Sequence, residues 1–361
     1  MTPRLRWLWW LPVFPLLGVS ALVFEANGGT VTTLVSLTLP ALCVTLALGR
    51  RTASLVVLTV GVVFVLSRFG HTPPSAVQSC VEEKCSSGSW WWQRIIDERE
   101  ATRAGLYLSG HLGSMPTGGA EFKRFDSLID AQWKAAQPAW RNGPNPLLMT
   151  SSPSRVESLR FSANGPRKRP AIIFLHGFGG LLSLYVRAVA DGTHGEYDVI
   201  APALDPLGEW WTERGQAVIA HTLDTLPPEV DRSRVYLIGL SNGGIGASAV
   251  LQHPKLAKRF AGVVLLSGAG SLEDLESAPP TRVLMISGTR DWRFQGDWVA
   301  DQHGQLAALG TDVTWRTFDA DHFLLLTHTE QWTRAFTEWT GSRRSVGVQV
   351  LQPRLDERLP L

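Results

Sequence analysis

The chain has 361 residues, of which 44% are hydrophobic and only 18% are charged, whereas about a quarter of the residues of a typical soluble protein are charged. Its net charge is +2 at pH 7, and it has neither a basic patch nor a long run of like charges. These features exclude a nucleic-acid-binding protein and a largely disordered chain. Charges are scarcest in residues 1–70, which contain five arginines and one acidic residue, Glu25.

Three uncharged stretches follow one another in this apolar region, at about residues 7–24, 29–49 and 52–67. A helix that crosses a bilayer needs about 20 apolar residues, so the first two are long enough and the third is short. Arginines at both ends of the third stretch can extend toward the membrane surface. We therefore expect an N-terminal bundle of three transmembrane helices over residues 1–70. A cleaved signal peptide is the alternative for the first stretch.

The arginines also predict an orientation. Arg4 and Arg6 precede the first stretch, and Arg50 and Arg51 lie between the second and the third. The loop between the first two stretches has no Lys or Arg, and positive residues prefer the cytoplasmic side. After three crossings, everything beyond Arg68 lies outside the cytoplasm. The sequence thus predicts an integral protein of the cell membrane whose larger part is extracytoplasmic.

The cysteines provide an independent argument for this orientation. Cys80 and Cys85 lie close together after the third stretch, and such a pair forms a disulfide in an oxidising compartment but stays reduced in the cytosol. A zinc site is the alternative, but only His71 lies nearby and no second cysteine pair follows. We therefore expect a disulfide between Cys80 and Cys85 and no metal site.

Residues 71–154 are expected to form a linker and a helical segment. Residues 71–89 are polar and contain the cysteine pair, and Trp90–Trp92 either dock at the membrane surface or, as we favour, pack on the following domain. Helices are expected at about residues 93–104 and 120–136, with an irregular glycine-rich stretch between them. Nothing in this region resembles a phosphate-binding loop.

From Arg155 onward, apolar strands alternate with helices, which is typical of a mainly parallel sheet covered by helices on both faces. The expected α/β domain spans residues 155–342, and the tail at 343–361 is expected to be loosely ordered. The strands are predicted at Val156–Ser162, Ala171–Leu175, Asp198–Ala203, Val235–Leu240, Val263–Ser267, Val283–Ser287 and Val313–Phe318. Helices are predicted at about 182–190, 212–225, 245–251 and 325–339.

Ser241 is the first candidate for a chemical role. It is the centre of the Gly-x-Ser-x-Gly pentapeptide Gly239–Gly243, between a predicted strand and a predicted helix. A sharp bend at this point pushes the serine Oγ into the open, and glycines are needed where a side chain would clash. The alternative is a serine that only caps the next helix.

A nucleophilic serine needs N–H donors that stabilise a developing oxyanion. The backbone N–H of Asn242, at the start of the predicted helix, is one candidate. The second is the N–H of Phe178 in the glycine-rich loop after the strand that ends at Leu175. His176 is expected to support this loop rather than to act as the base.

Two later strands end close to an acid and a histidine. Asp291 follows the strand that ends at Ser287, and His322 follows the strand that ends at Phe318. Asp291 would orient the imidazole of His322, which would take the proton of Ser241. The competing acids are less suitable, because Asp297 lies in a predicted helix and Asp319 and Asp321 are too near His322 in sequence; His328, the competing base, falls in the final helix.

With these residues in order, the chain resembles the α/β-hydrolase superfamily over about residues 155–341. The resemblance rests on the turn at Gly239–Gly243, the loop at His176 and Gly177, the acid turn at Gly288–Asp291, and His322. It implies the mainly parallel α/β-hydrolase sheet. The chain departs from the superfamily at Ala320, where many relatives have glycine. The connection before Val283 is also too short for the helical lid of many lipases, which leaves residues 90–150 as the candidate cover of the site.

The expected function is a membrane-anchored serine hydrolase that cleaves an ester, thioester or amide of a small-molecule or lipid-like substrate through an acyl-enzyme on Ser241, esters being favoured. Phe178, Trp292 and Phe323 adjoin the catalytic candidates and indicate an apolar acyl pocket. No cofactor and no nucleic-acid partner are expected. An acyltransferase or a serine peptidase of the same fold remains open. The alternative from another class is a noncatalytic, membrane-tethered binding domain.

Overall fold

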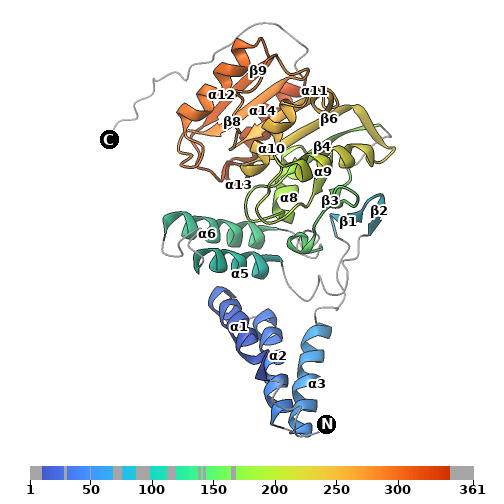
Figure 1. Cartoon of the computed structure of the whole chain (residues 1–361), viewed down its shortest axis with the longest axis vertical. Helices are drawn as coiled ribbons and strands as arrows, with labels where there is room; N and C mark the ends of the chain where they lie inside the picture. The colour runs from blue at the N-terminus through green and yellow to red at the C-terminus, as the bar shows by residue number, and fades with distance from the viewer. Residues whose placement is uncertain are drawn as a thin grey trace.

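The computed structural model describes residues 10–27, 31–48, 50–67, 75–86, 98–111, 119–136, 140, 144–163 and 168–341. Three tiers follow one another along its long axis (Figure 1). Three N-terminal helices form the first tier, the helix pair α5 and α6 forms the second, and an α/β domain forms the third. The expectations for Trp90–Trp92 and for the tail at 343–361 fall outside the described residues.

The first tier consists of α1 (Val13–Asn27), α2 (Val31–Ala47) and α3 (Arg51–Ser67). They coincide in position with the three apolar stretches, but the expected transmembrane crossings are not supported. Within the described part of the chain, no helix is both long and apolar enough to cross a membrane. The helices have 15 to 17 residues, which at the usual rise per residue gives roughly 23–26 Å, against about 30 Å of bilayer hydrocarbon.

The second tier is the pair α5 (Glu98–His111) and α6 (Ala120–Ala135). Ion pairs join the two helices, and Arg103 Nε donates to Asp126 Oδ1 at 2.6 Å. In the described part of the chain, helix α5 continues through Gly105 to His111, into the stretch that we expected to be irregular. An exposed helical glycine costs about 1 kcal/mol relative to alanine, and the burial of Leu106 and these ion pairs offset that cost.

The third tier is built on a mixed nine-stranded sheet with the order β2-β1-β3-β5-β4-β6-β7-β8-β9. The strands from β5 to β9 run parallel, whereas β1, β2 and β3 pair antiparallel at one edge. The strands are β1 (Gln78–Val81), β2 (Lys84–Ser86), β3 (Glu157–Phe161), β4 (Arg169–Leu175), β5 (Asp198–Pro202), β6 (Val230–Leu240), β7 (Gly262–Leu266), β8 (Val283–Gly288) and β9 (Val313–Phe318).

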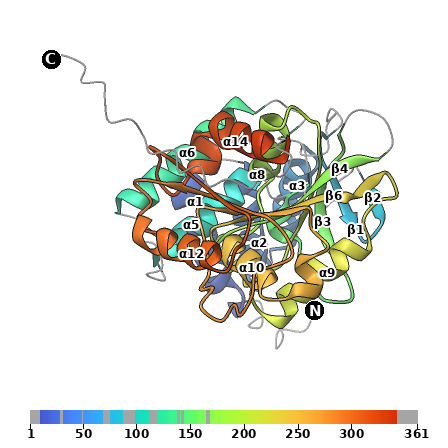
Figure 2. The same cartoon turned by 90° about the horizontal axis from the view of Figure 1, so that it is seen from above.

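Helices cover both faces of the sheet, as Figure 2 shows from above. One face carries α8 (Ser183–Gly192), α13 (Leu324–Thr327) and α14 (Thr329–Gly341), and the other carries α9 (Glu213–Asp224), α10 (Asn242–Leu251), α11 (Pro254–Ala257) and α12 (Gly296–Ala308). Alternation along β4 explains the two hydrophobic layers, because Ile172 and Phe174 face one side and Ile173 and Leu175 the other. The expected closing helix is divided at His328 into α13 and α14.

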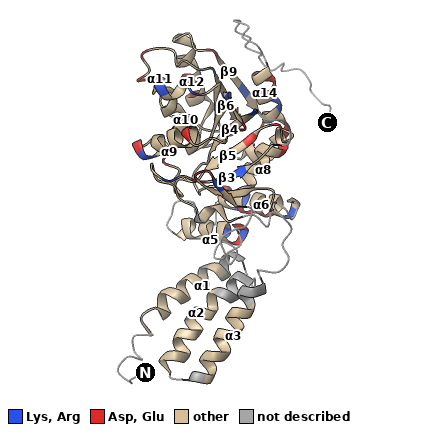
Figure 3. Cartoon of the chain, turned by 90° about the vertical axis from the view of Figure 1, so that its right-hand side faces the viewer, with Lys and Arg blue, Asp and Glu red and all other residues tan. Residues whose placement is uncertain are grey.

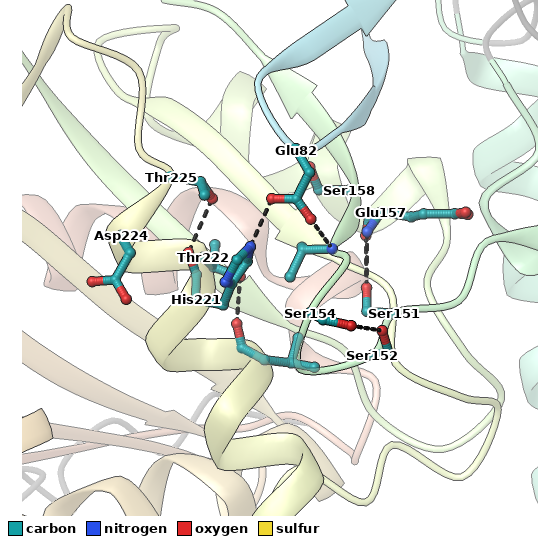
Figure 4. A network of polar contacts seen from close by, with 12 residues as sticks. Glu82, Ser151, Ser152, Ser154, Glu157, Ser158, His221, Thr222, Asp224 and Thr225 are labelled. Atoms are coloured by element: carbon teal, nitrogen blue, oxygen red, sulfur yellow. Dashed lines mark hydrogen bonds and ion pairs between the residues drawn. The ribbon is translucent and has the colours of Figure 1, made fainter.

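The edge hairpin β1–β2 lies in the stretch that we expected to be a linker. Cys80 and Cys85 face each other in the hairpin and form a disulfide. Between them, a carboxylate oxygen of Glu82 accepts the N–H of Val156 at 2.6 Å, and the other lies 2.7 Å from His221 Nε2 on α9 (Figure 4). Glu82 makes these contacts with residues far away in sequence. The four-residue sequence of β1 (Gln78–Val81) alone could therefore not predict a strand there.

Candidate active site

Ser241, His322 and Asp291 lie together at one edge of the sheet, each beyond the carboxyl end of a parallel strand. His322 Nε2 is 3.1 Å from Ser241 Oγ, and His322 Nδ1 is 3.0 Å from Asp291 Oδ2 and 3.1 Å from Oδ1. Ser241 follows β6, Asp291 follows β8 and His322 follows β9. The carboxylate of Asp291, the imidazole of His322 and the hydroxyl of Ser241 therefore form a continuous hydrogen-bonded series.

The turn at Ser241 is sharp and depends on its glycines. Ser241 has φ 54° and ψ −116°, a left-handed backbone conformation that non-glycine residues rarely adopt. A Cβ at Gly239 would lie 2.1 Å from the carbonyl oxygen of Gly243, and one at Gly243 would lie 2.2 Å from that of Leu175. Ser241 also donates its own N–H to Leu266 O at 3.0 Å, which fixes the bend against β7.

Asp291 is held as an acceptor by its own turn. Its side chain is buried, and Oδ1 accepts the N–H groups of Arg293 and Phe294 at 2.9 and 3.0 Å. The acid turn and the base loop are in close contact, because a Cβ at Gly288 would lie 2.2 Å from Ala320 O. Ala320 itself is fully buried in the core, so the alanine is accommodated at this point.

The competing groups have other partners. The Asp319 carboxylate is 84% exposed and pairs with Arg290 Nε at 2.9 Å, and Asp321 pairs with Arg124. His328 Nδ1 is 2.9 Å from Thr327 Oγ1. Asp297 lies on α12. The described residues thus place one carboxylate, that of Asp291, at hydrogen-bond distance from His322.

No protein-family model matches this sequence, and a comparison with curated proteins finds no match. Among solved structures, the chain is similar to a thermostable esterase (20% identity, TM-score 0.40), to Est1E from Butyrivibrio proteoclasticus (18%, 0.40) and to the Bacillus cereus carboxylesterase (20%, 0.41). The matches cover 51%, 52% and 51% of this chain and 58%, 93% and 94% of those proteins. The chain therefore spans little more than half of the thermostable esterase. Each likeness concerns about half of this chain.

The two expected oxyanion donors belong to segments that adjoin the serine. Asn242 is the first residue of α10, and its side-chain amide donates to Leu207 O at 2.7 Å. The loop that carries Phe178 approaches the serine closely, because a Cβ at Gly177 would lie 3.0 Å from Ser241 Cβ. Within the described residues, neither the Phe178 N–H nor the Asn242 N–H donates to another group. Both are therefore available to an anionic oxygen.

His176 makes hydrogen bonds that hold the loop at residues 176–180 in place. Its Nδ1 is 2.9 Å from Gly177 O and its Nε2 accepts the N–H of Leu204 at 3.3 Å. Its carbonyl oxygen accepts the indole N–H of the buried Trp210 at 2.9 Å. Desolvation by burial lowers the pKa of His176 to about 4, so the ring is neutral at pH 7 and can both donate and accept. His176 thus positions the loop.

Aromatic rings surround the imidazole of His322. Trp292 and Phe323 lie 5.9 and 6.0 Å from it, and Phe178 and Trp292 are 39% and 38% exposed. Phe294, which is not among the residues predicted from the sequence, stacks on the same imidazole at 5.9 Å. Its position three residues after Asp291 was the only available signal. No cluster of His, Cys, Asp or Glu suited to a metal ion occurs in the part of the chain that is described.

Proposed function

We propose that the chain is a serine hydrolase that cleaves an ester, thioester or amide through an acyl-enzyme on Ser241. The observation that carries this proposal is the hydrogen-bonded series from Asp291 through His322 to Ser241 Oγ. A serine hydroxyl is a weak nucleophile unless an adjacent base removes its proton. A left-handed turn that presents Oγ to the base has no comparable purpose in a serine that only caps a helix.

The reaction follows from the position of each group. Ser241 Oγ attacks the carbonyl carbon while His322 Nε2 takes its proton, and Asp291 holds the Nδ1–H side of the imidazole. The N–H groups of Phe178 and Asn242 stabilise the oxygen that becomes negative. His322 then protonates the leaving alcohol, thiol or amine. A water molecule, deprotonated by His322, releases the acid and restores Ser241.

The substrate is proposed to be a small-molecule or lipid-like acyl compound. Phe178 carries one of the proposed oxyanion donors, Trp292 follows the acid, and both rings are exposed. Exposed aromatic rings at such a site favour an apolar acyl or alcohol group of the substrate. Esters are the favoured class, because an alkoxide is a better leaving group than an amide nitrogen and needs less protonation.

A substrate panel tests this function. The purified full chain is incubated with p-nitrophenyl acetate, p-nitrophenyl octanoate, an acyl thioester and a p-nitroanilide. We expect turnover of the esters with an initial burst of p-nitrophenol, because these activated esters acylate Ser241 faster than water hydrolyses the acyl-enzyme. Faster transfer to an added alcohol than to water would indicate an acyltransferase. A folded protein that turns over none of the four would favour a noncatalytic binding domain.

We also propose that α1, α2 and α3 attach the chain to the cell membrane, with the α/β domain on the extracytoplasmic side. Two observations support this proposal. The described part of this helical tier contains few charged residues (Figure 3), and it exposes large apolar side chains such as that of Phe14, which is 77% exposed. Exposed apolar surface of this extent favours a lipid or protein contact. The disulfide between Cys80 and Cys85 suits an oxidising compartment.

Thiol counting checks the compartment. We expect protein isolated from its native cells, denatured without reductant, to contain one reactive thiol, that of Cys43, because Cys80 and Cys85 are joined. After reduction the count should rise to three. Three reactive thiols before reduction would contradict the disulfide and with it the extracytoplasmic position. The contribution of so short a loop to stability is expected to be about 2 kcal/mol.

A further inference from the structure

One turn of α6 contacts the two loops that carry the acid and the base. Glu121 Oε1 accepts from Arg293 Nη2 at 2.8 Å and from Nε at 3.1 Å, and Arg293 stands two residues after Asp291. Arg124 Nε donates to Asp321 Oδ2 at 3.0 Å, and Asp321 immediately precedes the base. The α6 side chains that make these contacts are three residues apart, so they share one face of the helix.

A third contact lies on the same face. The ring of Phe125 stacks on the ring of Phe323, with centroids 5.0 Å apart and planes 11° apart. Phe323 immediately follows His322, and its N–H donates to Asp321 Oδ1 at 3.0 Å. The two residues that flank the base in sequence are therefore both held by α6.

Helix α6 is itself fixed to α5, α8 and α13. Asp126 binds Arg103 of α5, and Gln132 Nε2 donates to Leu326 O at 3.2 Å while its backbone carbonyl accepts from Arg187 of α8. Buried residues along the helix, among them Ile129 and Trp133, join the main core. The helix can therefore act as a rigid support rather than follow the motion of the loops.

We propose that α6 is a clamp that keeps the acid turn and the base loop in register, with Glu121, Arg124 and Phe125 as positioning residues for the reaction of Ser241. The inference rests on the proposed function and adds to it a helix from outside the α/β domain. Asp291 and His322 stand on separate loops, and their hydrogen bond forms only when the loops keep their spacing. A displacement of about 1 Å at such a site can lower a rate up to a hundredfold.

The clamp differs from simple packing in the effects that it predicts. The pairs Arg124–Asp321 and Arg293–Glu121 are about half exposed on the arginine side, and exposed ion pairs contribute little to stability. Their loss should therefore reduce the rate more than it reduces stability. If α6 only covers the core, the same substitutions should leave both nearly unchanged.

The test compares Glu121→Gln and Arg124→Gln with the matched control Lys123→Gln. Lys123 lies on the same turn, is exposed and has no ion-pair partner among the described residues. We expect each clamp variant to lower kcat for p-nitrophenyl acetate about fivefold with little change in KM, and the double variant to lose more. Arg124→Lys should retain most of the activity, because an ammonium group can still pair with Asp321. The control should match the wild type.

Hydrogen exchange provides a second readout that does not depend on catalysis. Amides in residues 288–295 and 318–325 should exchange faster in the clamp variants than in Lys123→Gln, with a melting temperature within about 2 °C of the wild type. Wild-type rates together with wild-type exchange in the clamp variants would overturn the proposal, as would a lower rate that Lys123→Gln shares. An inactive wild type would refute the proposed function, and the exchange data would still decide on the clamp.

Discussion

Ser241→Ala is expected to abolish covalent labelling by a fluorophosphonate probe and to lower ester hydrolysis by roughly 10³- to 10⁶-fold. The probe forms its bond with an Oγ that a base has deprotonated, and in this chain His322 Nε2 lies 3.1 Å from that oxygen. Alanine removes only the hydroxyl. The backbone at φ 54° is as unfavourable for alanine as for serine, so the melting temperature should change little.

The matched control for this variant is Ser271→Ala, which removes an exposed hydroxyl beyond β7. It should label and turn over at the wild-type rate. Labelling that persists in Ser241→Ala, located by peptide mapping at another residue, would show that the nucleophile lies elsewhere. A folded wild type that resists the probe would again favour the noncatalytic alternative.

Asp291→Asn is expected to lower kcat by about 10⁴-fold and to leave the fold intact. The amide oxygen can still accept the N–H groups of Arg293 and Phe294, which now bind Oδ1. The amide NH₂, however, would donate to His322 Nδ1. The imidazole proton would then reside on Nε2, and this nitrogen could no longer accept the proton of Ser241.

Asp319→Asn is the matched control, because this carboxylate lies only three residues before the base in sequence and yet is exposed and paired with Arg290. We expect its rate to lie within about twofold of the wild type. Both rates are measured with p-nitrophenyl acetate at saturating concentration. A larger loss of rate in Asp319→Asn than in Asp291→Asn would show that Asp291 is not the orienting acid.

The residues of the candidate site were predictable because each has a local signature. An apolar strand followed by Gly239–Gly243 demands a sharp turn, and Asp291 and His322 both follow apolar runs of strand length. Carboxyl ends of parallel strands meet at one edge of a sheet, so the three side chains could be expected to converge. Phe294 was not predicted as a site residue, because a phenylalanine at this position in the sequence could equally well pack in the core or stack on a base.

The arrangement around the α/β domain was much less predictable. The segment Gln78–Val81 has too few residues to show a strand pattern, and its pairing partner β3 lies more than seventy residues later in the chain. The apolar stretches near the N-terminus predicted three helices at the right places. Their hydropathy did not predict where each helix begins and ends: α1 ends at Asn27, beyond the stretch at 7–24, and α3 begins at Arg51, one residue before the stretch at 52–67.

The sequence by itself determined the local turns and the alternation of strands and helices, because steric limits at glycine and the burial of apolar faces act between near neighbours. Only the tertiary structure decided the strand order, the edge hairpin held by Glu82, and the position of α6 over the acid and base loops. Contacts such as Arg293–Glu121 join residues 172 positions apart. Neither partner has a distinctive neighbourhood in the chain, since an exposed Arg or Glu fits many surfaces equally well until the fold brings one partner to it.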